Sequence, residues 1–151
     1  MTIKINSENL NVKRRVALKR AESVAAKALR ALKKKSGRVN IVFVSNQKIR
    51  ALNRKYRGKD ISTDVLAFPP GRRPGEVFSG EDRSFLGDIA ISSDKASENA
   101  RIYGGSYTEE IALYVIHGVL HLLGYDDTTA AGRRRMQRKE DELLQEIRRH
   151  S

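Results

Sequence analysis

The sequence predicts a single domain in which β-strands and α-helices alternate, of the α/β or α+β class. Its 151 residues suit one compact domain. Hydrophobic residues make up 39% of the chain and are spread along it, so one sizeable core can form. Short strand-like segments lie between longer segments with helical periodicity, which is typical of these two classes. We therefore expect residues 1–151 to form one domain.

Two strands and two helices are predicted in the first part of the chain. Residues 2–5 fit a short strand, and residues 38–44 fit a second one because apolar and polar side chains alternate there. A helix is predicted between them, over about residues 10–35, because its apolar residues fall on one side, opposite a basic face: Val12, Val16, Val24, Ala28 and Leu32. Ser45 is a suitable N-cap for a short helix that Gly58 ends.

Two further strands are predicted at residues 64–68 and 85–92. The tract between them, residues 69–84, contains all three prolines and is interpreted as a loop. A helix over about residues 94–103 follows the fourth strand. A last amphipathic helix is predicted from about Thr129.

Between these two helices lies a third that is apolar on all sides. Ser106 and Glu109 fit the S-x-x-E capping box, which predicts its first turn. Its body, IALYVIHGVLHLL, has no polar face, so we expect it to be buried in the core. Gly124 is well placed to end it.

This apolar helix carries two of the three histidines in the chain, His117 and His121. Residues four apart point the same way from a helix. Buried imidazole nitrogens need partners, and one shared metal ion satisfies both rings. The alternative is a pair of core histidines, each bonded to a carbonyl or a carboxylate. Because the chain contains no cysteine, any metal must be bound by His, Asp or Glu.

The residues that follow favour the metal. Zinc peptidases of the metzincin kind carry H-E-x-x-H-x-x-G-x-x-H, in which the glycine turns the chain so that the last residue reaches the metal. His117, His121 and Gly124 are in register with that pattern, and Asp127 occupies the third ligand position. Asp127 is preferred to the adjacent Asp126 on this register.

Gly118 argues against a peptidase, because it stands where that motif has its general base, a glutamate. A metal without this base suits the activation of water or the polarisation of a phosphoryl oxygen. We therefore expect a phosphodiester substrate rather than a peptide.

The charge distribution points to the same substrate. The net charge is +12, and residues 1–60 hold 18 Lys and Arg against three acids. Such a surface suits a polyanion, and the basic helix over residues 10–35 is expected to steer RNA. A merely solvated basic surface is the alternative. No apolar run reaches the roughly 18–20 residues that cross a bilayer, and no signal segment is visible, so a cytoplasmic protein without a membrane partner is expected.

The motif around the two histidines, together with three other stretches, resembles a known family. HGVLHLLGYDD (residues 117–127) is similar to the signature H-G-x-L-H-L-x-G-Y-D-H of the YbeY family of bacterial endoribonucleases. Residues 52–69 and 86–92 resemble that family's central block and next strand, and Met136, Glu140 and Leu144 resemble its closing helix. Together these stretches cover most of residues 40–145.

The resemblance implies a single α+β domain with a mixed sheet of about four strands and the metal-bearing helix buried in the core. It makes His117 and His121 catalytic metal ligands, and makes Arg57 the functional arginine of the cleft, where it binds RNA phosphate. For Arg57 the alternative is a helix-terminal cation. Lys59 is a further RNA-binding candidate. The family has a third histidine where this chain has Asp127. Zn²⁺ is expected as the cofactor, with Ni²⁺ or Mn²⁺ as alternatives because a carboxylate favours harder metals.

The resulting hypothesis is a metal-dependent endoribonuclease that hydrolyses single-stranded RNA. The resemblance implies roles in 16S rRNA 3′-end maturation and in ribosome quality control, with rRNA precursors and the small ribosomal subunit as partners. A non-catalytic RNA- or ribosome-binding assembly factor with a structural metal is the alternative. Asp64 and Asp88 are interpreted as structural residues, and His150 as a solvated residue near the end of the chain.

Overall fold

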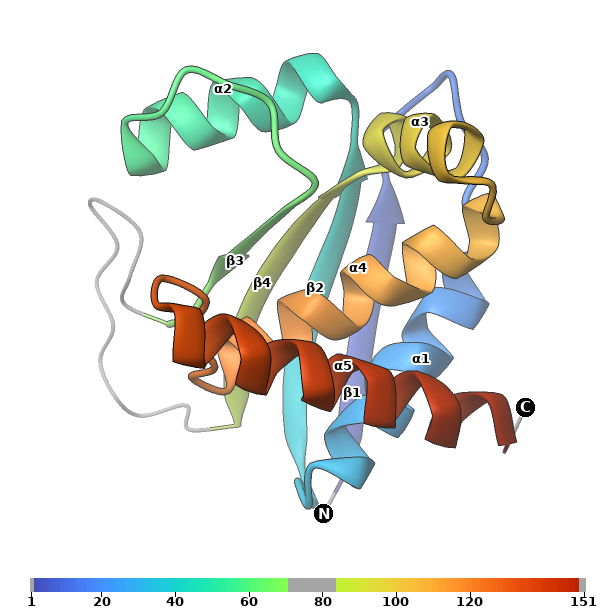
Figure 1. The fold of residues 1–151 in the computed structure, drawn as a ribbon, viewed down its shortest axis with the longest axis vertical. Helices are drawn as coiled ribbons and strands as arrows, with labels where there is room; N and C mark the ends of the chain where they lie inside the picture. Colours follow the sequence, from blue (N-terminus) through green and yellow to red (C-terminus); the bar gives the residue numbers. More distant parts are fainter. Residues whose placement is uncertain (1, 71–83, 150–151) are drawn as a thin grey trace.

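The computed structural model describes residues 2–70 and 84–149, which form a four-stranded mixed sheet packed with five helices (Figure 1). The strands are β1 (Ile3–Asn9), β2 (Gly37–Val44), β3 (Val65–Phe68) and β4 (Phe85–Ser92), in the spatial order β1-β2-β4-β3. The first three strands of that order are parallel, and β3 is antiparallel to β4. The predicted α+β class and strand number are confirmed.

The helices are α1 (Leu18–Ala31), α2 (Asn46–Arg57), α3 (Ser93–Tyr103), α4 (Tyr107–Leu122) and α5 (Ala130–Arg149). Helix α4 crosses one face of the sheet, and α5 lies over α4 on the side away from the sheet (Figure 1). The main core forms between that face and helices α1, α3, α4 and α5, with α4 at its centre. Helix α2 packs on the opposite face over Val44, Leu66, Phe68 and Ala90.

Alternation along the central strands explains why both faces are covered. Val39, Ile41 and Phe43 of β2 point into the main core, whereas Val42 and Val44 face α2. As predicted, α4 is buried: Val115, Ile116, Val119 and Leu120 have no exposed surface. Among the described residues, no helix is both long and apolar enough to cross a membrane.

The N-terminal segment differs from the prediction. β1 extends to Asn9 rather than to residue 5, and α1 begins at Leu18 rather than near Leu10, which leaves Val12 98% exposed. The side chain of Asn9 accepts from the backbone N–H of Asn11 (3.0 Å), and that of Asn11 accepts from the N–H of Lys13 (3.2 Å). Such local bonds compete with a helix, so the helical apolar spacing across residues 10–17 was misleading.

The end of α1 was also predicted too late. The helix stops at Ala31, Lys33 adopts a positive φ of 68°, and the N–H of Lys34 donates to the carbonyl of Leu29 (2.9 Å). This bond closes the last turn, so the chain leaves the helix before residue 35.

The remaining helix ends follow the sequence signals. The hydroxyl of Ser45 accepts from the N–H of Lys48, and the hydroxyl of Ser106 accepts from the N–H of Glu109. Gly58 ends α2 in the left-handed conformation. The predicted loop over residues 69–84 falls mostly outside the described residues, as does His150.

Candidate metal centre

His117 and His121 lie one turn apart near the C-terminal end of α4. Their Nε2 atoms are 3.0 Å apart and their ring centroids 4.6 Å apart. The sheet side of α4 is sealed by apolar contacts, whereas each histidine side chain keeps 28% of its surface exposed. The two rings therefore face a region that solvent and a small ligand can reach.

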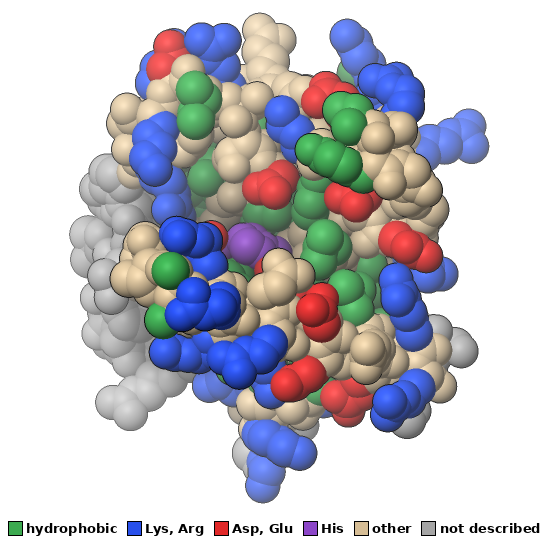
Figure 2. All heavy atoms as spheres, in the orientation of Figure 1, with side chains coloured by type: hydrophobic (Ala, Val, Ile, Leu, Met, Phe, Trp, Pro, Cys, Tyr) green, Lys and Arg blue, Asp and Glu red, His purple; other side chains and the backbone are tan. Residues whose placement is uncertain are grey.

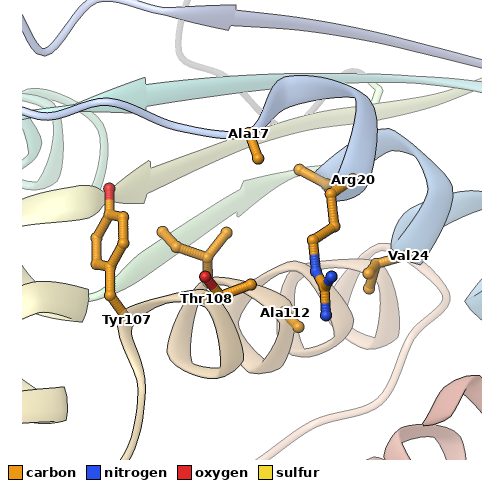
Figure 3. A pocket seen from close by; sticks show the side chains of 8 residues that line it. Ala17, Arg20, Val24, Tyr107, Thr108 and Ala112 are labelled. Atoms are coloured by element: carbon orange, nitrogen blue, oxygen red, sulfur yellow. The ribbon is translucent and has the colours of Figure 1, made fainter. Parts of the chain in front are cut away.

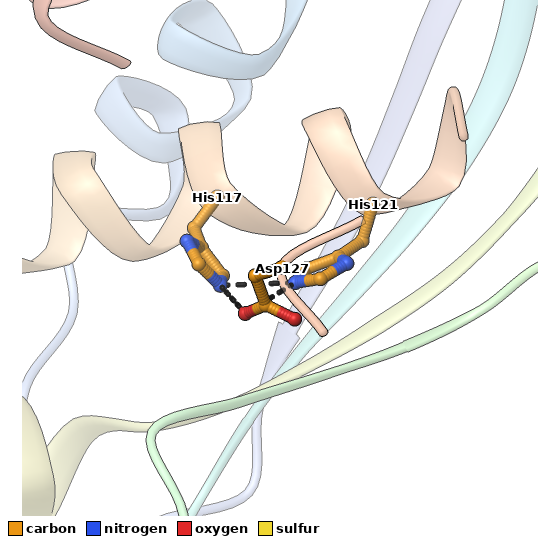
Figure 4. Close-up of side chains that lie close together, drawn as sticks. All are labelled: His117, His121 and Asp127. Atoms are coloured by element: carbon orange, nitrogen blue, oxygen red, sulfur yellow. Dashed lines mark hydrogen bonds and ion pairs between the residues drawn. The ribbon is translucent and has the colours of Figure 1, made fainter. Parts of the chain in front are cut away.

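Asp127 returns to these rings because the chain turns after α4. Gly124 has a φ of 95°, a left-handed conformation that suits glycine. The turn brings Oδ2 of Asp127 to 3.9 Å from Nε2 of His117 and 3.6 Å from Nε2 of His121 (Figure 4). The structure thus brings together the three residues that the motif register predicts as ligands.

These three residues, which we call the triad, offer two imidazole nitrogens and one carboxylate oxygen within 4.8 Å of one another. This donor set suits a divalent ion such as zinc, and its exposed side leaves room for a further ligand. The neighbouring Asp126 does not join the triad. Its carboxylate instead accepts from the N–H and the hydroxyl of Thr128, both at 2.9 Å.

Glu140 of α5 is a site residue that the sequence analysis did not single out for function. Its carboxylate is buried, with 6% of the residue exposed, and it bonds Nδ1 of His117. A carboxylate on Nδ1 fixes the ring and leaves Nε2 directed at Asp127. A signal was present: Glu140 stands among Met136 and Leu143 on the apolar stripe of the helix, where a charged side chain needs a partner.

The two histidines have different protonation tendencies. Burial lowers the pKa of His117, but the hydrogen bond and charge of Glu140, together with Asp64 and Asp127, raise the pKa above its ordinary value overall. Burial and the charge of His117 lower the pKa of His121. His121 is therefore neutral at neutral pH and has a lone pair available for a metal.

Arg57 lies beside the triad at the end of α2. Its Nη2 donates to the carbonyl of Ala67 on β3 (2.7 Å), and its guanidinium carbon is 5.7 Å from the centroid of the Phe68 ring. Its positive charge contributes to lowering the pKa of His121. The side chain is anchored yet exposed. Lys59 is exposed two residues later, and its backbone N–H donates to Asn53.

Asp64 and Asp88 take positions consistent with structural roles. Asp64 accepts from the N–H of Val65 (2.8 Å) at the start of β3, and Asp88 accepts from the side chain of Asn40 (3.0 Å). Asp88 belongs to a row with Asn40 and Asn6 across three strands, on the sheet face away from α4.

A small apolar cavity of about 30 Å³ lies between the starts of α1 and α4 (Figure 3). Arg20 and Val24 of α1 line it together with Ala17, just before that helix, and Tyr107 and Ala112 line it from α4. Its volume is about that of one water molecule, and it holds no constellation of reactive groups.

The fold and the triad together define a class: a small α+β protein with an open set of metal ligands on a core helix. Residues 2–148 match the family model described as Endoribonuclease YbeY, so the chain belongs to the YbeY family. The resemblance found in the sequence is confirmed.

Similar proteins agree with this assignment. A protein named Endoribonuclease YbeY from Anaeromyxobacter sp. (strain Fw109-5) is 44% identical over 143 residues, which is 95% of this chain and 70% of the relative. One of the same name from Carboxydothermus hydrogenoformans is 44% identical over 110 residues, covering 73% of this chain and 72% of the relative. The solution structure of TM1509 from Thermotoga maritima matches with a TM-score of 0.58 and 27% identity, over 99% of this chain and 93% of that one.

Proposed function

We propose that this protein is a metal-dependent endoribonuclease that hydrolyses phosphodiester bonds of single-stranded RNA. Membership of the YbeY family supports the reaction type, because its members are named endoribonucleases. The observation that carries the proposal is the convergence of three ligand atoms within 4.8 Å, with an exposed guanidinium, that of Arg57, beside them.

His117, His121 and Asp127 would hold the metal ion. When bound, a divalent ion supplies a Lewis acid for water activation and phosphoryl polarisation. Two imidazoles and one carboxylate suit zinc, and the carboxylate in place of a third histidine shifts the preference toward harder ions such as Mn²⁺, with Ni²⁺ as a further alternative. Glu140 holds the ring of His117 so that Nε2 stays aimed at the ligand position.

Arg57 supplies the phosphate contact in this proposal. One of its nitrogens is anchored on Ala67, and the rest of the guanidinium remains able to donate to a phosphoryl oxygen. Its charge is placed where negative charge develops during phosphoryl transfer. Lys59 would add a second, looser contact from the exposed turn after α2.

The proposed substrate is precursor ribosomal RNA in the cytoplasm, with 16S 3′-end maturation and ribosome quality control as the processes served. The basic surface supports an RNA partner, because clustered cations that neutralise RNA phosphates release their counterions, and this release favours binding. Binding at or near the small ribosomal subunit follows from that substrate.

The test combines metal content with RNA cleavage. The untagged protein and the variants His121→Ala and Asp127→Ala would be assayed by inductively coupled plasma mass spectrometry and with labelled single-stranded and duplex RNA. We expect about one transition metal per chain, cleavage of the single strand only, and loss of both in each variant.

Asp126→Ala is the matched control, because Asp126 adjoins the triad without joining it, and it should keep metal and activity. A folded protein that binds metal and RNA but cuts no RNA would favour the assembly factor with a structural metal.

A further inference from the structure

A cluster of cations at the start of α5 lies outside the part of the chain from which RNA binding was predicted. Residues 130–139 contain five cations and no acid: Arg133, Arg134, Arg135, Arg138 and Lys139. The four arginines are exposed. Clustered exposed cations repel one another, so a polyanion that neutralises them binds favourably.

The contacts of α5 show which way the cluster faces. Residues four and seven apart share one helix face, so Arg133, Gln137 and Glu140 form a stripe. Glu140 bonds His117, and Nη1 of Arg133 donates to the backbone carbonyl of Asp127 at 3.4 Å. This stripe therefore borders the triad. Arg134 and Arg138 each follow a member of this stripe by one residue, so they lie about 100° further around the helix, on its solvent side.

The last turn of α2 presents a second set of cations across the triad. Arg54, Lys55 and Arg57 are all exposed there, and the charge of Arg57 reaches His121. Figure 2 shows the histidine side chains at the bottom of a hollow, with Lys and Arg side chains below it and to its upper left, and Asp and Glu side chains above it and to its right. The triad thus lies between two basic surfaces on different helices.

The first half of helix α1, which belongs to the predicted steering helix, borders the opposite end of α4. Its Arg20 and Val24 line a groove with Ala112 of α4 and Ile147 of α5. The 16 residues of α4 make it about 24 Å long at 1.5 Å per residue, and the histidines are near its other end. The cations in the first half of α1, such as Arg20, are therefore farther from the triad than those of α5, whereas Lys34, after the end of α1, lines a groove with Gly124 and Tyr125.

We propose that the start of α5, through Arg134 and Arg138 with Arg133 beside them, is a phosphate-binding surface for single-stranded RNA. The strand crosses the triad with phosphates held by α2 on one side and by α5 on the other. A strand held on both sides presents the phosphodiester bond between the two contacts to the triad. This inference rests on the proposed function, since it takes RNA as the substrate.

The first test is RNA binding by fluorescence anisotropy, with a labelled 20-nucleotide single-stranded RNA and a chelator that keeps the strand intact. The double variant Arg134→Ala/Arg138→Ala is compared with Arg20→Ala/Arg30→Ala, which removes the same two charges from exposed positions on α1. We expect the α5 variant to bind roughly tenfold more weakly. Its plot of log affinity against log salt should be shallower by about 1.4, the slope of two phosphate contacts to a single strand.

The outcomes separate the two proposals. Equal losses in both double variants would show a diffuse effect of net charge and overturn the α5 surface. If the α5 variant binds and cuts RNA as well as the wild-type protein does, the α5 surface is overturned and the proposed function stands. If the wild-type protein binds no RNA, both the α5 surface and the proposed function are overturned.

A second test locates the strand directly. The chain has no cysteine, so Gln137→Cys and Gln145→Cys can each carry one photo-crosslinking maleimide. Both glutamines are exposed on α5, and they are two turns apart. We expect cross-linking to the RNA from position 137 to exceed that from position 145 several-fold. Equal yields would contradict the proposed path.

Discussion

Gly118 shows how one residue joins the chemistry of the site to the packing beneath it. The sequence identified it only as the missing general base of a peptidase. In the structure a Cβ at this position would lie 2.6 Å from Cγ2 of Ile89 on β4. The glycine therefore lets α4 approach the sheet closely, so the residue that argues against a peptidase also sets the distance between β4 and the helix that carries the two histidines.

We predict that Gly118→Ala destabilises the protein by about 1–3 kcal/mol, because the added methyl group overpacks a closed contact. Urea denaturation followed by circular dichroism measures the change in the free energy of unfolding. Gly105→Ala is the control, since nothing lies within 4 Å of a Cβ there. A Gly118→Ala protein as stable as the control would contradict this prediction, because it would show that Ile89 and β4 can move to accommodate the methyl group.

Glu140 acts through His117 rather than on a ligand itself. We predict that Glu140→Ala weakens metal binding by about tenfold to a hundredfold, because the imidazole loses the partner that orients it. Glu140→Gln, whose side-chain oxygen still accepts from Nδ1, should recover much of the affinity.

Competition with a coloured chelator measures the metal dissociation constant of each Glu140 variant. Glu142→Ala on the same helix is the control, because its side chain is 64% exposed. A purely structural role for Glu140 would change the stability and leave the metal affinity of the folded fraction unchanged.

Among the elements, the ends of helices and strands explain where the sequence analysis succeeded and where it failed. Caps such as Ser45 and Ser106 act on backbone groups three residues away, so a short stretch of sequence is enough to predict these helix starts. The start of α1 depends on Asn11, whose side chain donates to Ser93 and Asp94, more than 80 residues later. Glu140 likewise acquires its role only when α5 packs on α4. Contacts of this kind are tertiary, and periodicity does not reveal them.

Asp94, at the start of α3, connects the segment before α1 with the start of α2 by hydrogen bonds. It accepts from Asn11 and Arg14 near the N-terminus and from the backbone of Asn46 in α2. Burial raises the pKa of its carboxyl, but these hydrogen bonds outweigh burial and hold the pKa below the ordinary value of 3.8. A lowered pKa contributes stability above the unfolded-state value, and this contribution declines as the pH falls through the folded-state value.

We predict that Asp94→Asn costs about 1–3 kcal/mol near pH 7, because charged hydrogen bonds are lost. The difference between wild type and variant should shrink as the pH falls below about 4. Denaturation series between pH 7 and pH 3 measure it. A difference that stays constant over this range would mean that the charge of Asp94 contributes nothing.

At the scale of the whole molecule, the charge of the chain is arranged around the triad by folding and not by sequence order. The sequence places most of the positive charge in residues 1–60, and α2 belongs to that part. The start of α5 belongs to the part with a slight excess of acids, yet it reaches the same hollow. A count of charges along the chain predicted the class of partner, and only the fold indicates the surface.

The whole domain should gain stability when the triad binds a metal, because the ligand geometry exists only in the folded chain. At a zinc concentration 100 times the dissociation constant, linkage gives about 2.7 kcal/mol, or a rise in Tm of about 5–10 °C. Differential scanning calorimetry of metal-free protein with and without added zinc measures the shift. Asp127→Ala should show little of this rise and Asp126→Ala nearly all of it, whereas equal shifts would place the ion elsewhere.

The compactness of the triad along the chain has a consequence for how an ion enters and leaves. All three ligands fall within residues 117–127, and only the turn after α4 separates the carboxylate from the helix that carries the imidazoles. Closing so short a loop costs little chain entropy. A bound ion would therefore exchange by a brief opening of that turn while the sheet and the core helices keep their native pairing. We expect metal exchange and global unfolding to be separate events, so that the protein would change its metal without refolding.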